Sequence, residues 1–211
     1  MAFQLPESLQ SSDDDAALAL LTRYYGRPFA GPGSAVGAAF DHWDSTGTRV
    51  QDVDRFTADD LVAVTFLSVD VSATAARALL RERADEFAAL LADVGQDRDL
   101  VDEVDPLADD WAGWAVMSAL RGLDRIGPTT ASKLLARKRP RLRPIWDTVV
   151  TKVTGSTEQQ WEPLRQALRA DDAALHHRLL RLRAAAGLPD DIGALRIFDV
   201  ICWREGKDRG W

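Results

Sequence analysis

Apolar residues recur at helical spacing through most of the chain. Side chains three and four positions apart lie on one face of a helix, so this period separates helices from strands. Within 72–94, for example, Leu79, Leu80, Phe87, Leu90 and Leu91 follow it. In the first two thirds of the chain the pattern predicts helices over 13–25, 57–67, 72–94, 108–122 and 128–137.

Local stop and start signals place the remaining helices. Helices are expected to begin near Asp147, at Ser156, near Asp171 and after Pro189, with Gly187 ending the third of these. Ser156 and Gln159 have capping-box spacing. Residues 26–56 contain five glycines and predict a long loop, with a short strand near 38–43.

These elements predict an all-α fold without βαβ alternation or internal repeats. We divide the chain into an N-terminal helix with a Gly-rich loop (1–56), a helical lobe (57–143) and a C-terminal helical lobe (144–211). A chain of 211 residues is long enough for two lobes that share a core.

Composition excludes several classes of protein. No apolar run approaches the ~18 residues of a membrane span. The first residues lack the pattern of a signal peptide, so a cytoplasmic location is expected. Cys202 is the only cysteine, which excludes an intramolecular disulfide and a cysteine-ligated zinc or iron–sulfur site. His176 and His177 have no partners at metal-binding spacing, and we expect no metal and no cofactor.

Charge is divided unevenly along the chain. The net charge is −7, yet residues 121–143 carry eight Lys or Arg and one acid, a local net charge of +7 (8 − 1). Such a segment is typical of a DNA-binding surface. A solvated helix face that forms salt bridges with the acidic remainder explains the pattern equally well.

The segment 121–143 also contains a tight turn followed by a helix, in the sequence Leu123-Asp-Arg-Ile-Gly-Pro-Thr-Thr-Ala. Gly127 suits a sharp turn because it has no Cβ. The unpaired N–H groups at the start of the next helix attract an anion such as a DNA phosphate, to which Thr129, Thr130 and Lys133 could add contacts. An ordinary turn between two packed helices is the alternative.

Asp147 lies eighteen residues after Thr129 (147 − 129 = 18), in the sequence Pro144-Ile-Trp-Asp-Thr-Val. It is a natural N-cap for the apolar helix that follows. A carboxylate at this place could also stabilise positive charge on a sugar and deprotonate a water molecule during cleavage of a base–sugar bond. Capping and catalysis are compatible.

The two motifs over 108–150 resemble the helix-hairpin-helix DNA glycosylase superfamily, which includes endonuclease III and adenine glycosylases. Phe56-Thr-Ala-Asp-Asp-Leu-Val-Ala-Val and Lys138-Arg-Pro also resemble an uncharacterised bacterial domain family of unknown function. The superfamily resemblance implies a two-lobed helical fold, duplex DNA as partner and Asp147 as the catalytic aspartate.

Three departures from the superfamily pattern narrow this expectation. Thr129 occupies the position of the lysine nucleophile and cannot form a Schiff base, so the resemblance implies a monofunctional glycosylase without lyase activity. Arg125 replaces the first glycine of the hairpin. The iron–sulfur cysteines of some members are absent.

DNA is expected to lie along the basic segment 121–143 and to contact Arg137, Lys138, Arg139 and Arg141, beside Gly127 and the following helix. An extruded base would stack on aromatic residues, although such residues are more often part of a core. The candidates are Trp146, Trp111, Trp114, Tyr25 and Trp43, with Tyr24 and His42 nearby.

Three functions therefore remain open from the sequence. The first is a monofunctional DNA N-glycosylase that uses Asp147. The second is a non-catalytic nucleic-acid-binding module in which Asp147 only caps a helix. The third is a protein-interaction module on the same scaffold, which fits the net charge of −14 over residues 1–120.

Overall fold

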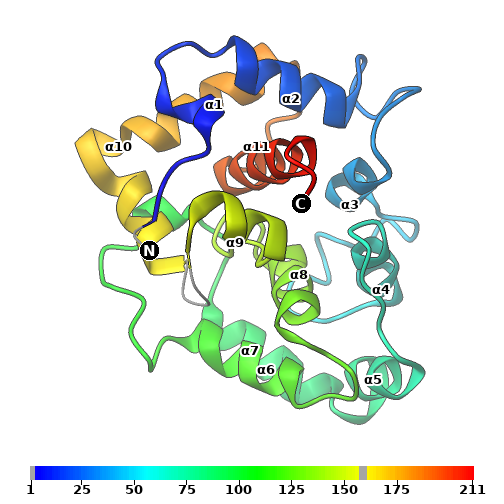
Figure 1. Cartoon of the computed structure of the whole chain (residues 1–211). Helices are drawn as coiled ribbons and strands as arrows, with labels where there is room; N and C mark the ends of the chain where they lie inside the picture. The colour runs from blue at the N-terminus through cyan, green and yellow to red at the C-terminus, as the bar shows by residue number, and fades with distance from the viewer. Residues whose placement is uncertain (1–2, 157–160) are drawn as a thin grey trace.

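The computed structural model of the chain describes residues 3–156 and 161–211, and the described residues form helices and no strands (Figure 1). The fold is all-α, as predicted. The α-helices are α1 Glu7–Gln10, α2 Asp15–Tyr25, α3 Ala39–His42, α4 Ala58–Thr65, α5 Ala73–Arg77, α6 Ala84–Val94, α7 Ala112–Arg121, α8 Pro128–Lys138, α9 Thr148–Thr154, α10 Trp161–Ala185 and α11 Ala194–Asp208. None of these helices is long and apolar enough to cross a membrane.

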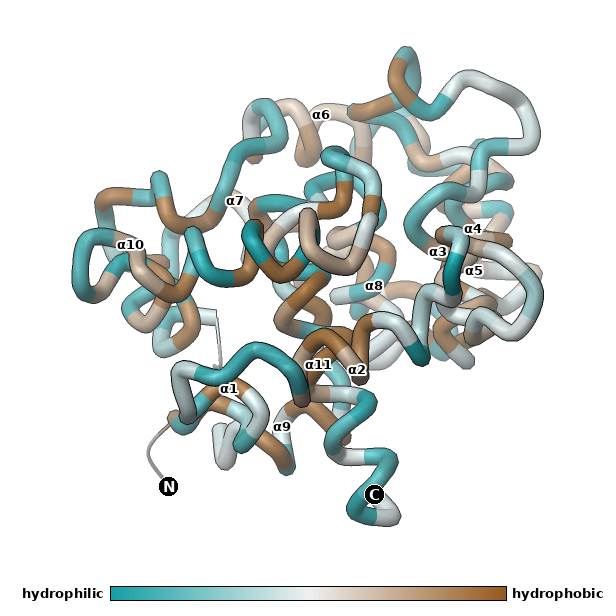
Figure 2. Tube along the Cα trace, turned by 90° about the horizontal axis from the view of Figure 1, so that it is seen from above, coloured by the Kyte–Doolittle hydropathy of each residue, from teal (hydrophilic) through white to brown (hydrophobic). Residues whose placement is uncertain are grey.

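Helix α11 is the central element of the fold. It packs against α2, α9 and α10, which surround it in Figure 1. A helix that is apolar on most sides must be buried, and α11 buries Leu195, Ile197, Phe198, Val200 and Ile201. Hydrophobic segments gather around it at the centre of the trace (Figure 2). One continuous core contains residues from all three predicted segments, from Leu9 to Cys202.

A short turn joins α7 to α8, and the two helices pack together. Pro128 occupies the first turn of α8, where its missing N–H costs nothing. Gly127 has a φ of −83° and a Cβ there would meet no atom within 4 Å, so the turn does not require glycine at this position. The left-handed residue is Arg125, with a φ of 57°. Backbone strain in this turn therefore lies at Arg125.

Two elements predicted in the N-terminal half of the chain differ from the structure. The expected single helix over 72–94 is interrupted by a π-helical segment at Ala78–Glu82 and by Arg83, whose φ is −123°. The strand expected near 38–43 is instead a 3₁₀ turn, Val36–Ala38, followed by α3. Short apolar runs do not distinguish these alternatives because neighbouring elements decide the conformation.

The C-terminal helices agree in part with the predicted boundaries. Helix α10 has non-helical backbone angles from Ala170 to Ala173, which is where a new helix was expected near Asp171. The last helix begins at Ala194 because Pro189 and Ile192 form a turn before it, in which the Ile192 N–H donates to the Pro189 carbonyl. The capping box predicted for Ser156 and Gln159 involves a position outside the described residues.

The basic residues at the end of α8 are buried, which contradicts their predicted place on a DNA-binding surface. Arg137, Lys138 and Arg139 are each exposed by 5% or less. Arg137 and Lys138 both pair with buried Asp60, at 3.2 and 2.5 Å, and Arg139 pairs with Asp54. Arg141 is exposed, but its guanidinium pairs with Asp99. The alternative of internal salt bridges with acidic residues is the one that the structure supports.

These buried cations hold the Gly-rich loop in place. Arg137 donates to the carbonyls of Phe40 and Trp43, and Lys138 donates to the carbonyl of Asp52 at 2.9 Å. Arg139 donates to the carbonyls of Val53, Leu91 and Gly95 at 2.6–2.8 Å. Since buried carbonyls require partners, these charges satisfy carbonyls of the loop and of the end of α6.

Candidate active site

A cavity of about 440 Å³ opens beside α11. Its wall is formed by segments that are distant in sequence: α2, the turn before α3, the segment after α4, the first turns of α8 and α9, and one face of α11. The charged and aromatic residues that line it are Tyr24, Phe66, Lys133, Asp147, Arg196, Asp199, Trp203 and Lys207.

Helix α11 presents a single face to the cavity. The residues that line it are Arg196, Asp199, Val200, Trp203 and Lys207. Successive positions are three or four residues apart, except for the adjacent pair Asp199 and Val200. Residues at this spacing project from the same side of a helix. The opposite sides of α11 lie in the apolar core, so the helix is held rigidly while its polar face lines the cavity.

Asp147 caps α9 and also lines the cavity. One carboxylate oxygen, Oδ1, accepts a hydrogen bond from the Val149 N–H at 2.9 Å, as an N-cap residue does. The other, Oδ2, lies 3.3 Å from Nζ of Lys133. The side chain is 16% exposed. Capping therefore occupies one oxygen and leaves the other beside the cavity.

Lys133 is buried and directed toward the cavity. Its ammonium group donates to the Leu67 carbonyl at 2.8 Å as well as pairing with Asp147. Leu67 precedes Ser68, a cavity-lining residue with a left-handed φ of 60°. Strained residues of this kind are often found at functional sites. Lys133 thus links α8, α9 and the segment after α4 around one side of the cavity.

A second charged group lies on α11. Arg196 donates to Asp41 at 2.8 Å, to the Tyr24 hydroxyl at 2.7 Å, and to Asp199. The Tyr25 hydroxyl donates to the same Asp41 at 3.0 Å. All of these side chains are almost completely buried, so their orientations are fixed by hydrogen bonds from several elements.

The surroundings shift the pKa of two groups that line the cavity. Burial raises the pKa of Asp199 to about 6, against the opposing effect of Arg196, and the charge of Asp147 raises it further. Burial also raises the pKa of Tyr24 to about 12, although Arg196 lowers it. A carboxyl group with a pKa near neutrality in a cavity is a common feature of catalytic sites.

The structure brings together three of the predicted site residues. Thr129, Lys133 and Asp147 all line the cavity, although they come from two helices. Gly127 is exposed in the α7–α8 turn, and Thr130 is buried in α8. Neither lines the cavity. The side chain of Lys133 points into the interior, so it does not lie on the surface where a phosphate contact was expected.

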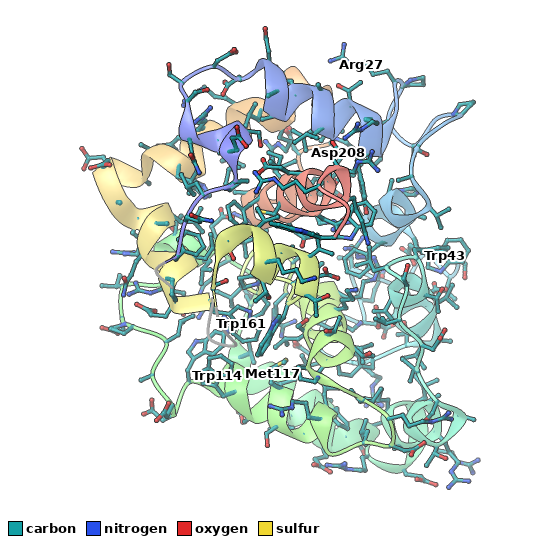
Figure 3. All side chains as sticks on the ribbon, in the orientation of Figure 1. Arg27, Trp43, Trp114, Met117, Trp161 and Asp208 are labelled. Atoms are coloured by element: carbon teal, nitrogen blue, oxygen red, sulfur yellow. The ribbon has the colours of Figure 1, made fainter. Side chains whose placement is uncertain are left out.

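None of the five preferred aromatic residues lines the cavity. Trp111 and Trp114 pack with Trp161 in a separate cluster, where the rings of Trp114 and Trp161 stack at 4.6 Å. Trp43 donates from Nε1 to Asp59 at 3.1 Å. Figure 3 shows it at the right of the view, away from Trp114 and Trp161.

The remaining two aromatic candidates, Tyr25 and Trp146, also make structural contacts. Tyr25 is fully buried beside Tyr24 and Phe29. Trp146 is half-buried, and its backbone N–H donates to the Ser132 hydroxyl at 2.9 Å. Tyr24, which was named only as a neighbour of these candidates, does line the cavity, together with Trp203 and Phe66.

Sequence reasoning did not find the contribution of α11. A signal was present, because Asp199 stands between Phe198 and Val200 in a helix whose apolar residues predict burial. An ionisable residue in such a helix needs a partner or a function. Arg196, one turn earlier, would have been the first partner to consider.

The described residues contain no group of three or more His, Cys, Asp or Glu side chains arranged to hold a metal ion. The side chains of the cavity wall combine two carboxylates in different environments, two buried cations and several aromatic rings.

The fold and the cavity define an all-helical protein with a charged site at the junction of several helices. A family model described as a family of unknown function (DUF6308) matches residues 17–206, and the chain belongs to that family. No curated protein and no solved structure matches the chain.

Proposed function

We propose that the cavity beside α11 is the active site of a hydrolase of DNA-glycosylase type, which cleaves the bond between a base and its sugar. The observation that carries this proposal is the place of Asp147. Its carboxylate lines a cavity of about 440 Å³ together with Thr129 of the helix that follows the α7–α8 turn. The resemblance of the two motifs led us to expect a carboxylate within reach of that turn.

Asp147 would act on water and on the sugar. Cleavage of a base–sugar bond builds positive charge on the sugar, and a nearby carboxylate stabilises that charge. The same carboxylate orients or deprotonates the attacking water. Lys133 and the Val149 N–H hold the group in place from two directions, so little rearrangement is needed during the reaction.

The DNA contact in this proposal rests on the α7–α8 turn rather than on the whole basic segment. Of the eight basic residues in 121–143, only Arg121, Arg125 and Arg141 are exposed. Arg121 and Arg125 flank the turn, and Gly127 is exposed beside them. No side chain caps the N-terminus of α8, which leaves its first N–H groups available to a phosphate.

The burial of the other five basic residues supports a second candidate, in which the substrate is a free nucleoside or nucleotide. The cavity and the chemistry would be unchanged, and no extended basic surface would be required. In this candidate the substrate is a single nucleoside or nucleotide instead of DNA, and Asp147 keeps the same role.

Base release is the test of both candidates. Purified protein is incubated with duplexes that carry uracil, hypoxanthine, 7-methylguanine or 8-oxoguanine, and separately with the corresponding nucleosides, and released base is measured by chromatography. Release from a duplex supports the first candidate, and release from nucleosides alone supports the second. If neither kind of substrate yields base, the proposed function is wrong.

A borohydride trapping experiment tests the absence of lyase chemistry. Thr129 cannot form a Schiff base, and the ammonium group of Lys133 is held by Asp147 and the Leu67 carbonyl. We therefore expect no covalent complex between the protein and an abasic duplex after reduction. A trapped complex that disappears in Lys133→Ala would assign the nucleophile to this lysine instead.

A further inference from the structure

Asp199 is a carboxyl group in the cavity wall to which the proposed function assigns no role. Its Oδ2 accepts from Arg196. The side chain is 10% exposed and lines the cavity, so a bound group can reach it.

The charges around Asp199 do not balance. Arg196 is shared between Asp199 and Asp41, and Lys133 is paired with Asp147. Three carboxyl groups therefore face two cations in a largely buried network. A surplus of buried negative charge favours a proton on one of the carboxyl groups.

The other charged or titratable groups near Asp199 do not remove this surplus. Arg143 borders the same void of about 20 Å³ as Asp199, but its guanidinium lies over the Trp111 ring at 3.1 Å. Its pKa is lowered to about 8 by burial. Lys207 is exposed at the rim of the cavity. The Tyr24 hydroxyl accepts from Arg196 and keeps its own proton.

We propose that Asp199 is the proton donor to the departing base, and that it works opposite Asp147 in the same cavity. This inference rests on the proposed function. Asp147 has a cation of its own, Lys133, and accepts a backbone N–H. Asp199 shares its cation with Asp41 and is more deeply buried, which favours its protonated form. Two carboxyl groups in contrasting environments divide the roles of acid and base.

These two carboxyl groups account for both proton transfers of the hydrolysis. The oxygen of water forms a bond to the sugar carbon as the bond from that carbon to the base nitrogen breaks. The Asp199 carboxyl gives its proton to the base, and the Asp147 carboxylate takes a proton from the water. The base leaves in its neutral form, the sugar gains a hydroxyl group, and exchange with solvent returns the two carboxyl groups to their initial states.

The dependence of the reaction on pH is the first test. Burial raises the pKa of Asp199 to about 6. A required acid is lost as pH rises through its pKa, so kcat/KM of the wild-type protein should fall about tenfold per pH unit above that value. In Asp199→Asn the rate at pH 6 should fall about 10²-fold or more, and the alkaline decline should disappear. The amide oxygen of Asn still accepts from Arg196, so the network is retained.

The identity of the leaving base is the second test. A neutral base such as hypoxanthine needs a proton to leave, whereas 7-methylguanine already carries a positive charge and leaves as a neutral molecule. Asp199→Asn should therefore slow release of hypoxanthine much more than release of 7-methylguanine. Asp208→Asn is the matched control on the same helix, because Asp208 pairs with Arg23 at the surface, and its rates should equal those of the wild-type protein.

The outcomes separate this inference from the proposed function. If Asp199→Asn slows both bases equally and keeps the alkaline decline, or leaves all rates unchanged, Asp199 is not the proton donor while Asp147 stands. If the wild-type protein releases no base from any duplex or nucleoside, the proposed function fails and the role of Asp199 fails with it. Asp147→Asn, in contrast, should lose activity toward both bases.

Discussion

At the scale of single residues, Asp147 combines an observed structural role with a proposed chemical one. It was recognisable from the sequence as an N-cap and as a candidate catalytic carboxylate. The structure assigns one oxygen to the cap and places the other next to Lys133 at the cavity. The two interpretations therefore describe two different atoms of one side chain.

Arg139 shows the opposite outcome for a charged residue, because its role is in folding. It is 1% exposed and donates to three carbonyls outside its own helix, in the loop and at the end of α6, besides pairing with Asp54. Arg139→Ala should lower the free energy of unfolding by about 3–5 kcal/mol, because it leaves a buried network without its cation. The measurement is urea unfolding followed by circular dichroism.

Arg141 provides the matched control for Arg139. It lies two positions later, is exposed, and pairs with Asp99. Arg141→Ala should lower the free energy of unfolding by only about 1 kcal/mol or less, as is typical of an exposed ion pair. Equal effects of the two substitutions would contradict the assignment of Arg139 to the interior network.

At the scale of elements, the Gly-rich loop is a well-connected part of the fold. Asp59, at the start of α4, accepts from Ser45 at 2.6 Å, from the Thr46 N–H at 3.0 Å and from Trp43. These hydrogen bonds lower its pKa to about 2, the bond from Ser45 having the largest effect. The loop is thus fixed around Trp43 by Asp59 and Arg137, and near its C-terminal end by Lys138 and Arg139.

Replacement of Asp59 should release the centre of the loop while the rest of the protein stays folded. Asp59→Ala removes several hydrogen bonds to a charged group, each worth about 1.5–3 kcal/mol when buried, and should increase hydrogen exchange across 43–48. Asp85→Ala is the control, since Asp85 is 95% exposed and pairs with Arg55 at the surface. Unchanged exchange in Asp59→Ala would show that the loop is held without it.

The sequence predicted most helices because their apolar periodicity is local information. Helices α2, α4, α7 and α8 lie close to their predicted ranges, and Asp147 was correctly expected to cap α9. The break at Arg83 and the turn that delays the start of α11 to Ala194 were not predicted.

The cavity was only partly predictable, because local sequence patterns do not show which distant segments pack together. Thr129, Lys133 and Asp147 belong to two motifs that are close in sequence, so their proximity could be expected. Arg196 and Asp199 reach the same cavity from α11, and only the packing of the whole chain brings them there. The basic segment was ambiguous because periodicity does not show whether a charge faces solvent or a buried carboxylate.

For the whole molecule, the distribution of exposed charge decides how DNA could bind. The net charge is −7, and five of the eight basic residues in 121–143 are buried. Association with duplex DNA would therefore depend on the few cations around the α7–α8 turn. A small electrostatic contact of this kind implies modest affinity with a shallow dependence on salt.

Reversal of charge at the turn tests this docking surface. Arg121→Glu combined with Arg125→Glu should weaken binding to a duplex, and the slope of log affinity against log salt should become shallower by about 2, as expected for two lost phosphate contacts. Fluorescence anisotropy with a labelled duplex measures both quantities. Arg181→Glu, on the exposed side of α10, is the control. If the control and the double variant bind equally, DNA does not dock at the turn.

The most direct test of the account compares base release by the wild-type protein, Asp147→Asn and Asp147→Ala under single-turnover conditions. Both substitutions remove the charge opposite Lys133, but Asn retains the cap and Ala does not, so Asp147→Ala should be about 1 kcal/mol less stable than Asp147→Asn. Both variants should release base about 10²- to 10⁴-fold more slowly than the wild-type protein. Base release by Asp147→Asn at the wild-type rate would contradict the central claim, and Asp147 would then be a helix cap alone.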